Sequence, residues 1–92
     1  MQINYDLIGR ALIHPVQRRI LEMFAEQPGR VSPVAISKYL ELPLSNVSYH
    51  VGILAGDPKG RYAGTPLLRL VDTAQRRGAI EHFYRLTKKA AA

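Results

Sequence analysis

The sequence has no cysteine, no long apolar run and few acidic side chains. Without cysteine there is no disulfide scaffold, no thiolate metal site and no cysteine nucleophile, and the composition fits a reducing compartment. No apolar stretch approaches the roughly 18 residues of a membrane span. The N-terminus, MQINYDLIGR, lacks the pattern of a signal peptide. We therefore expect a cytoplasmic protein without a membrane partner.

The 92 residues form a basic chain with a single predicted domain over residues 1–92. Hydrophobic residues make up 47% of the sequence, which is enough for one small core. Lys and Arg number 13 against 7 Asp and Glu, so the formal net charge is +6, and most of it lies from Lys38 onward. A small basic domain makes a nucleic acid the first hypothesis for its partner. Genome composition alone could also explain the many arginines.

Apolar spacing predicts four helices in the first 55 residues. A loose helical spacing indicates a first helix over 3–13, and an amphipathic helix follows from Pro15 until Pro28-Gly29. Ser32-Pro33, a hydroxyl N-cap before a proline at the first helical position, begins a short third helix. A fourth begins near Leu44, with Val47, Val51 and Leu54 as its apolar stripe.

The third and fourth helices, within residues 33–55, have the spacing of a helix-turn-helix. Its second helix must hold an apolar stripe in the core and present small polar side chains to base edges. Four residues of the fourth helix meet that requirement: Ser45, Asn46, Ser48 and Tyr49. An ordinary solvated helix face would also be polar, so the spacing alone leaves both interpretations open.

The last segment changes to the alternating pattern of strands and predicts a β-hairpin over residues 67–87. Gly78 is the expected left-handed turn residue. Arg76 and Arg77 lie at the tip, where arginines can reach a phosphate or the minor groove. A solvated β-turn would also tolerate them. Lys38, Lys59 and Arg61 are further candidates for backbone contacts.

Together these segments resemble the ArsR-like winged helix-turn-helix family over about four-fifths of the chain. The resemblance rests on three stretches: His14-Pro15-Val16-Gln17-Arg18-Arg19-Ile20-Leu21, Ser45-Asn46-Val47-Ser48-Tyr49-His50-Val51 with Leu54, and Arg77-Gly78 with Phe83-Tyr84-Arg85-Leu86-Thr87. It implies a mainly α fold in which a β-hairpin follows four helices. It also implies major-groove contacts by Ser45, Ser48 and Tyr49, with Asn46 beside them, and a wing that contacts DNA through Arg76 and Arg77.

The chain departs from that family in three places. It lacks the cysteines through which many members sense metal, and it lacks the C-terminal helix that other members use for metal ligands. That helix usually pairs with the first helix in the dimer, so residues 3–13 are left as the expected homodimer element. The loop over Gly56–Pro66 is longer than usual. We expect no metal and no cofactor.

The histidines have structural interpretations. We expect His50 to pack or hydrogen-bond, His82 to be half-buried on a strand and His14 to shape a helix junction. None is paired at helical spacing, which argues against a zinc site. Ser48, His82 and Asp72 would compose a triad on paper, but nothing indicates a pocket, so we expect no catalysis.

Aromatic residues and the tail complete the expectations. Four aromatics are assigned to the core: Tyr5, Phe24, Tyr39 and Tyr84. Tyr49 and Tyr62 are expected to be exposed, and residues 87–92 to be frayed.

The sequence therefore predicts a double-stranded DNA-binding transcriptional regulator that acts as a repressor at a prokaryotic nucleoid. An alternative is a winged-helix protein-interaction module without direct DNA readout. RNA binding is a weaker alternative, because exposed aromatic stacking pairs are not apparent.

Overall fold

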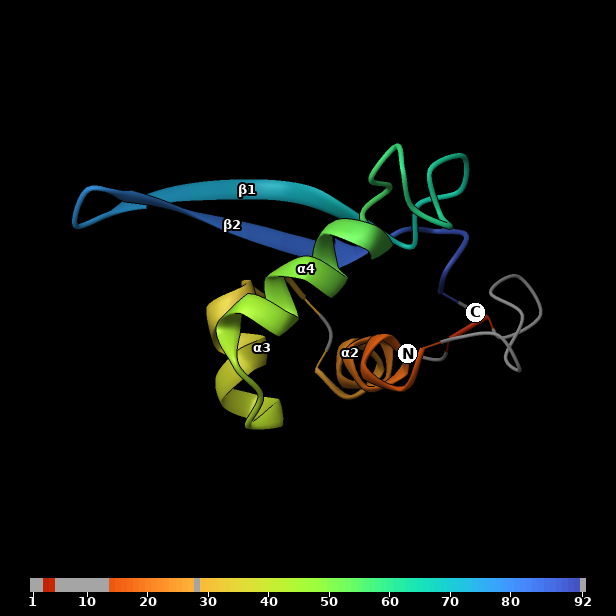
Figure 1. The fold of residues 1–92 in the computed structure, drawn as a ribbon, viewed down its shortest axis with the longest axis horizontal. Helices are drawn as coiled ribbons and strands as arrows, with labels where there is room; N and C mark the ends of the chain where they lie inside the picture. Colours follow the sequence, from red (N-terminus) through yellow and green to blue (C-terminus); the bar gives the residue numbers. More distant parts are fainter. Residues whose placement is uncertain (1–2, 5–13, 28, 92) are drawn as a thin grey trace.

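The structure is a computed structural model that describes residues 3–4, 14–27 and 29–91. Three helices precede an antiparallel hairpin that projects from them (Figure 1). The elements are α2 (Pro15–Glu26), α3 (Pro33–Leu40), α4 (Leu44–Leu54), β1 (Leu68–Arg76) and β2 (Ala79–Leu86). This is the order of a winged helix-turn-helix, and it confirms the predicted fold class.

The expected first helix falls mostly outside the described residues. Residues 5–13 are not described, so a helix there stays a prediction. Ile3 forms an antiparallel bridge with Ala91, and the Asn4 amide donates to the Ala90 carbonyl at 2.8 Å. The segment just before this region is thus extended and lies against the end of the chain.

Local capping explains where two helices begin. Nδ1 of His14 accepts the amide of Val16 at 3.1 Å, and Pro15 occupies the first turn of α2, where its missing N–H is harmless. The hydroxyl of Ser32 accepts the amide of Ala35 at 3.3 Å ahead of Pro33. His14 therefore caps the start of α2, whereas its predicted role in a junction with the first helix involves residues outside the described ones.

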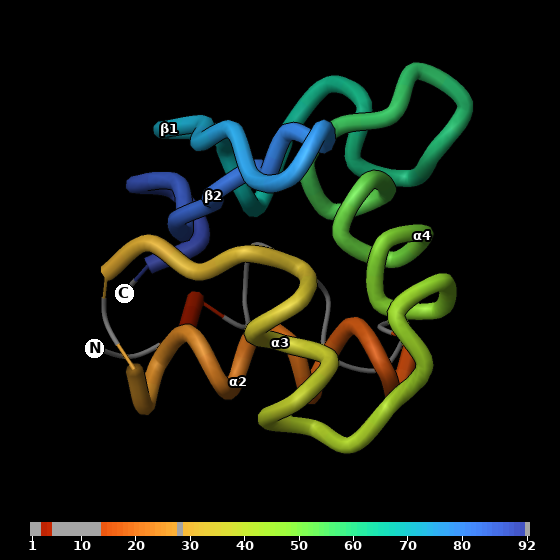
Figure 2. The backbone as a smooth tube through the Cα atoms, turned by 90° about the vertical axis from the view of Figure 1, so that its left-hand side faces the viewer, coloured from red at the N-terminus to blue at the C-terminus, as the bar shows by residue number. Residues whose placement is uncertain are grey.

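One core lies between the three helices and the base of the hairpin (Figure 2). The amphipathic face of α2 packs on α3 and α4, and the core continues into the residues that begin β1. Phe24 is buried and Tyr84 packs against the core, as expected, whereas Tyr5 lies outside the described residues. The largest fully buried side chains are those of Phe24, Ile20, Leu21, Ile36, Leu54, Leu67, Leu68, Val47 and Val51.

The predicted burial of two tyrosines was wrong: Tyr39 was expected in the core and Tyr62 at the surface, and the structure shows the reverse. Tyr39 is exposed, because its hydroxyl reaches across to the α2 surface and donates to a Glu26 carboxylate oxygen at 2.9 Å. This hydrogen bond raises the pKa of Tyr39. Tyr62 is buried, because the loop after α4 folds back and adds its ring to the core.

The hairpin has a regular register interrupted once. Leu68 pairs with Leu86 at the base, and a bulge falls between Leu70 and Asp72. The tip is a two-residue turn in which Arg77 and Gly78 have φ of 48° and 83°. Positive φ at both positions is the signature of a type I′ turn, whose twist suits a hairpin. Gly78 has the left-handed conformation that the sequence predicted.

The outer half of the hairpin is more exposed than the alternation predicted. His82 was expected to be half-buried, but it is exposed, as is Ile80. The strands extend past the helices, and the bulge shifts the pairing before these residues. The expected inward face is correct near the base, where Leu68 is buried and Tyr84 and Leu86 pack against the core.

The tail was expected to be frayed, which is wrong for residues 87–91. The hydroxyl of Thr87 donates to the Pro66 carbonyl at 2.9 Å, and its amide donates to Leu67 at 3.0 Å. The Ala90 amide donates back to Thr87 at 3.1 Å, and Ala90 is fully buried. The tail is thus fastened to the base of the hairpin.

Candidate nucleic-acid interface

Helix α4 is divided lengthwise into a buried and an exposed face. Its buried residues are Val47, His50, Val51 and Leu54. The four predicted base-reading residues, Ser45, Asn46, Ser48 and Tyr49, are all exposed. At 3.6 residues per turn these four share one arc of the helix, opposite the buried stripe. The fold therefore presents hydroxyl, amide and phenol groups together on one free surface.

The turn between α3 and α4 fixes the angle of this exposed helix. Glu41 takes the left-handed conformation with φ 56°, and the Ser37 hydroxyl donates to the Leu42 carbonyl at 2.6 Å. The Leu42 amide donates to the Ser37 carbonyl at 3.1 Å. Arg19 of α2 donates to the last carbonyl of α3, that of Leu40, at 3.2 Å. Three residues, 41–43, separate the two helices, as expected of a helix-turn-helix.

A buried polar contact joins α4 to α2. The side-chain amide of Gln17 donates to Nδ1 of His50 at 3.1 Å, and both residues are buried. An accepting Nδ1 requires the neutral ring with its proton on Nε2. The pKa of His50 is lowered by burial first and by the nearby His14 second, whose ring centroid is 4.5 Å away. The predicted packing and hydrogen-bonding role of His50 is confirmed.

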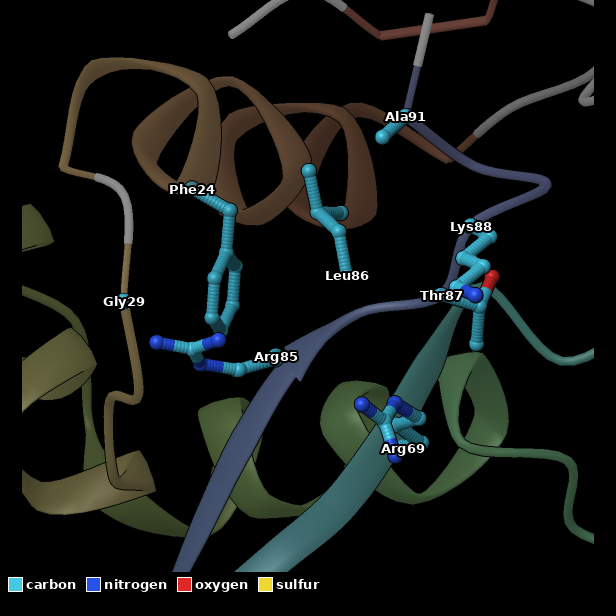
Figure 3. A pocket seen from close by; sticks show the side chains of 8 residues that line it. All are labelled: Phe24, Gly29, Arg69, Arg85, Leu86, Thr87, Lys88 and Ala91. Atoms are coloured by element: carbon cyan, nitrogen blue, oxygen red, sulfur yellow. The ribbon is translucent and has the colours of Figure 1, made fainter.

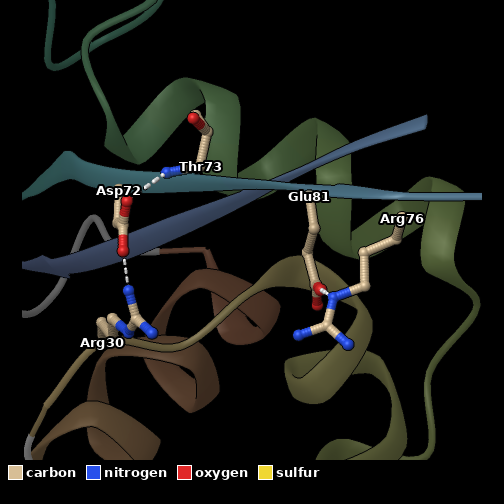
Figure 4. A network of polar contacts seen from close by, with 5 residues as sticks. All are labelled: Arg30, Asp72, Thr73, Arg76 and Glu81. Atoms are coloured by element: carbon tan, nitrogen blue, oxygen red, sulfur yellow. Dashed lines mark hydrogen bonds and ion pairs between the residues drawn. The ribbon is translucent and has the colours of Figure 1, made fainter. Parts of the chain in front are cut away.

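The wing tip carries the two predicted arginines. Among the described residues Arg76 has an ion-pair partner and Arg77 has none. Arg76 Nε lies 3.1 Å from Glu81 Oε1 across the hairpin (Figure 4). Its side chain still remains largely exposed. Arg77 occupies the first position of the turn and is exposed. The pairing with Glu81, which positions and partly neutralises Arg76, was not predicted from the sequence.

The wing is fastened to the helices through the short segment before α3. Val31 pairs with Tyr84 of β2 through two backbone hydrogen bonds of 2.9 Å each, so it acts as a third, one-residue strand. Arg30 forms an ion pair with Asp72 (Figure 4), and its guanidinium lies 4.6 Å from the centroid of the Phe83 ring. Asp72 of β1 and Phe83 of β2 are partners in the hairpin register, so Arg30 contacts both strands.

The contacts of Arg30 with Asp72 and Phe83 were not predicted from the sequence. Arg30, Asp72 and Phe83 belong to three different segments of the chain, and no sequence pattern links them. Asp72 is also occupied by the Thr73 amide, which donates to it at 2.8 Å. With its carboxylate held by Arg30 and by the Thr73 amide, Asp72 links the segment before α3 to the wing.

The remaining predicted backbone contacts do not gather at one place. Lys38 is exposed on α3 beside the helix-turn-helix. Lys59 and Arg61 are exposed in the loop after α4, which lies at the base of the hairpin, away from its tip (Figure 1). This loop is closed tightly, because a Cβ on Gly56 would lie 2.9 Å from the Pro66 ring.

Comparison with known proteins found a similarity in the helical part of the chain. Residues 12–56 match the sequence model of a family described as a helix-turn-helix domain. This match spans α2, α3 and α4 and ends where the loop toward the wing begins. No curated protein matches the chain. Among the described residues, no helix is long and apolar enough to cross a membrane, and no cluster of three or more His, Asp or Glu is arranged to hold a metal ion.

Proposed function

We propose that the protein is a sequence-specific, double-stranded DNA-binding transcriptional regulator of the ArsR-like winged helix-turn-helix type, and that it acts as a repressor. The observation that carries the proposal is the exposed polar arc of α4 opposite its buried stripe. The match of residues 12–56 to a helix-turn-helix family supports it. In such domains the second helix enters the major groove.

In this proposal the exposed arc of α4 reads base edges. Asn46 has the amide that pairs with adenine through two hydrogen bonds, and the hydroxyls of Ser45 and Ser48 can donate or accept. Tyr49 is 65% exposed and is the largest of the four side chains. Its ring packs edge-to-face with the ring of the buried His50, with 5.2 Å between the two centroids.

The wing supplies a second contact in the same direction. Figure 1 shows the hairpin tip and the α3–α4 turn lying toward the same end of the molecule. Arg76 and Arg77 would bind phosphate or enter the minor groove, while Lys38, Lys59 and Arg61 make lesser backbone contacts. The net charge of +6 supports this electrostatic part of binding.

A homodimer through residues 3–13 completes the proposal. Two copies of α4 would then address half-sites about 34 Å apart, which is one turn of DNA. The protein would act in the cytoplasm at the nucleoid of a prokaryotic cell.

Selection of bound duplexes from a random pool tests the proposal. We expect enrichment of a palindromic site, whose spacing also reports the dimer. On the selected site, Asn46→Ala should cost about 1–3 kcal/mol of discrimination and relax the preference at one base pair. Lys89→Gln, which changes an exposed side chain outside the predicted interface, is the control. Absence of enrichment at about 0.1 M salt would contradict DNA readout and favour a protein-docking role.

A further inference from the structure

A hollow of about 420 Å³ lies at the base of the wing, outside the proposed DNA interface (Figure 3). It is formed by the end of α2, by Gly29, by both strands and by the tail. In Figure 2 the segment after α2 and the C-terminal tail lie on the side opposite to α4. Its size falls within the roughly 300–1,000 Å³ of small-molecule pockets.

The hollow combines an apolar floor with a basic rim. Phe24 and Leu86 provide the floor, and both belong to or pack on the core. Arg69, Arg85 and Lys88 provide the rim, and Figure 3 shows them coming from β1, β2 and the tail. None of the described residues that line it is acidic.

The two arginines of the rim are in an unfavourable arrangement without a ligand. Arg69 and Arg85 are direct partners in the hairpin register, where like charges repel. Within the described part of the chain, neither of the ion pairs Arg30–Asp72 and Arg76–Glu81 uses Arg69, Arg85 or Lys88. The pair also borders a second, more open hollow along the hairpin, where Asp72 already neutralises Arg30. An anion in the first hollow would relieve the repulsion.

We propose that this hollow binds a small organic anion with an apolar body. A carboxylate or phosphate group would pair with Arg69, Arg85 and Lys88, since guanidinium groups match both anions through forked hydrogen bonds. The aromatic or aliphatic body would lie on Phe24 and Leu86. Because the arginines belong to the wing and Phe24 to α2, the ligand connects the two parts of the molecule. The proposal does not depend on DNA binding.

Nuclear magnetic resonance titration of the full chain, labelled with ¹⁵N, tests the proposal. Four probes separate the contributions: phenyl phosphate, benzoate, inorganic phosphate and benzyl alcohol. We expect saturable shifts of the Gly29, Thr87 and Lys88 amides with phenyl phosphate or benzoate, and the stronger of these two identifies the preferred head group. Inorganic phosphate should bind at least tenfold more weakly, and benzyl alcohol should give no saturable shift.

Matched variants assign the effect to the rim. Lys88→Gln should weaken binding severalfold, whereas Lys89→Gln, the same substitution one residue away and outside the hollow, should leave it within twofold. Arg69→Gln combined with Arg85→Gln should weaken binding at least tenfold. Since these changes remove a repulsive pair, the double variant should unfold at the same temperature as the wild type or a higher one, which shows that the loss is not misfolding.

Three results would overturn the proposal. One is equal affinity for phenyl phosphate and inorganic phosphate, which would show that the apolar floor contributes nothing. Another is an unchanged affinity in the double arginine variant. The third is displacement of phenyl phosphate by a random-sequence DNA duplex, which would make the three cations a DNA-backbone contact.

Discussion

The helical body and the wing of this protein are stabilised by different means. In the body, side chains such as Ile20, Ile36 and Leu54 are fully buried, and their packing holds three helices together. The outer wing has almost no such contacts, and its apolar side chains Leu70 and Ile80 are exposed. Its conformation depends on the turn, the strand pairing and a few attachments near its base. The same chain therefore joins a well-packed scaffold to an arm that packing scarcely restrains.

The largest expected difference between the two regions is in the free energy of unfolding. Leu54→Ala in the body should lower it by about 2–5 kcal/mol, because a cavity remains where the side chain was. Ile80→Ala in the wing should change it by about 0.5 kcal/mol or less. Urea denaturation measures both. If Leu54→Ala does not fold, Ile36→Val should still cost about 0.5–1.5 kcal/mol. Equal effects in body and wing would refute the comparison.

The next effect concerns the contribution of the wing to DNA binding. Replacing both Arg76 and Arg77 with Ala should weaken binding to all sequences and reduce the slope of log affinity against log salt by about 2, roughly one for each phosphate contact. Since Glu81 pairs with Arg76, Glu81→Gln should strengthen binding at low salt. Fluorescence anisotropy over a salt series gives the slope. An unchanged slope would remove the wing from the interface.

A smaller effect is expected at the junction between the two regions. Arg30→Gln removes the ion pair with Asp72 and the contact with Phe83, both partly exposed, so it should cost about 1 kcal/mol or less. Faster hydrogen exchange should follow in the amides of β1 and β2, while the amides of α2 keep their protection. Asp72→Asn should act in the same direction. Faster exchange throughout the molecule would show that Arg30 supports the body as well.

The smallest effect is a dependence of stability on pH that belongs to the body. The lowered pKa of His50 means that the unfolded chain takes up a proton at a higher pH than the folded chain does. The free energy of unfolding should therefore be highest above about pH 6.5 and decline as the pH falls through the folded-state pKa. Urea denaturation at pH 8 and pH 5 measures this decline. His50→Gln should remove most of it, and His82→Gln, on the exposed wing, should retain it.

The body was predicted from the sequence more completely than the wing and the tail. Helix starts are local, so Ser32-Pro33 and the 3.6-residue spacing of α4 were sufficient to place them. The turn at Gly78 was likewise a local feature. The side chains of the exposed arc followed from the same spacing, although their contacts with DNA stay a prediction.

The features that were missed depend on contacts between distant segments. Tyr39 was wrongly assigned to the core and Tyr62 to the surface. The burial of each depends on a contact with a distant segment: the hydrogen bond of Tyr39 to Glu26, and the packing of Tyr62 on the core. The pairing of Arg30 with Asp72 spans 42 positions of sequence and has no periodic signal. The tail was missed because its order comes from Thr87 bonding back to the base of the hairpin. None of these contacts follows from local propensity.

The turn at the wing tip shows a compromise between folding and activity. A left-handed backbone costs a residue with a side chain on the order of 1–2 kcal/mol, and hairpins of this type favour Asn or Gly there. This chain has arginine at that position, with φ 48°. The conformational penalty falls on an exposed residue at the hairpin tip, where a cation would serve the proposed DNA contact. Arginine at the tip therefore makes the turn less stable and adds a positive charge, while the packing of the helical body is unaffected.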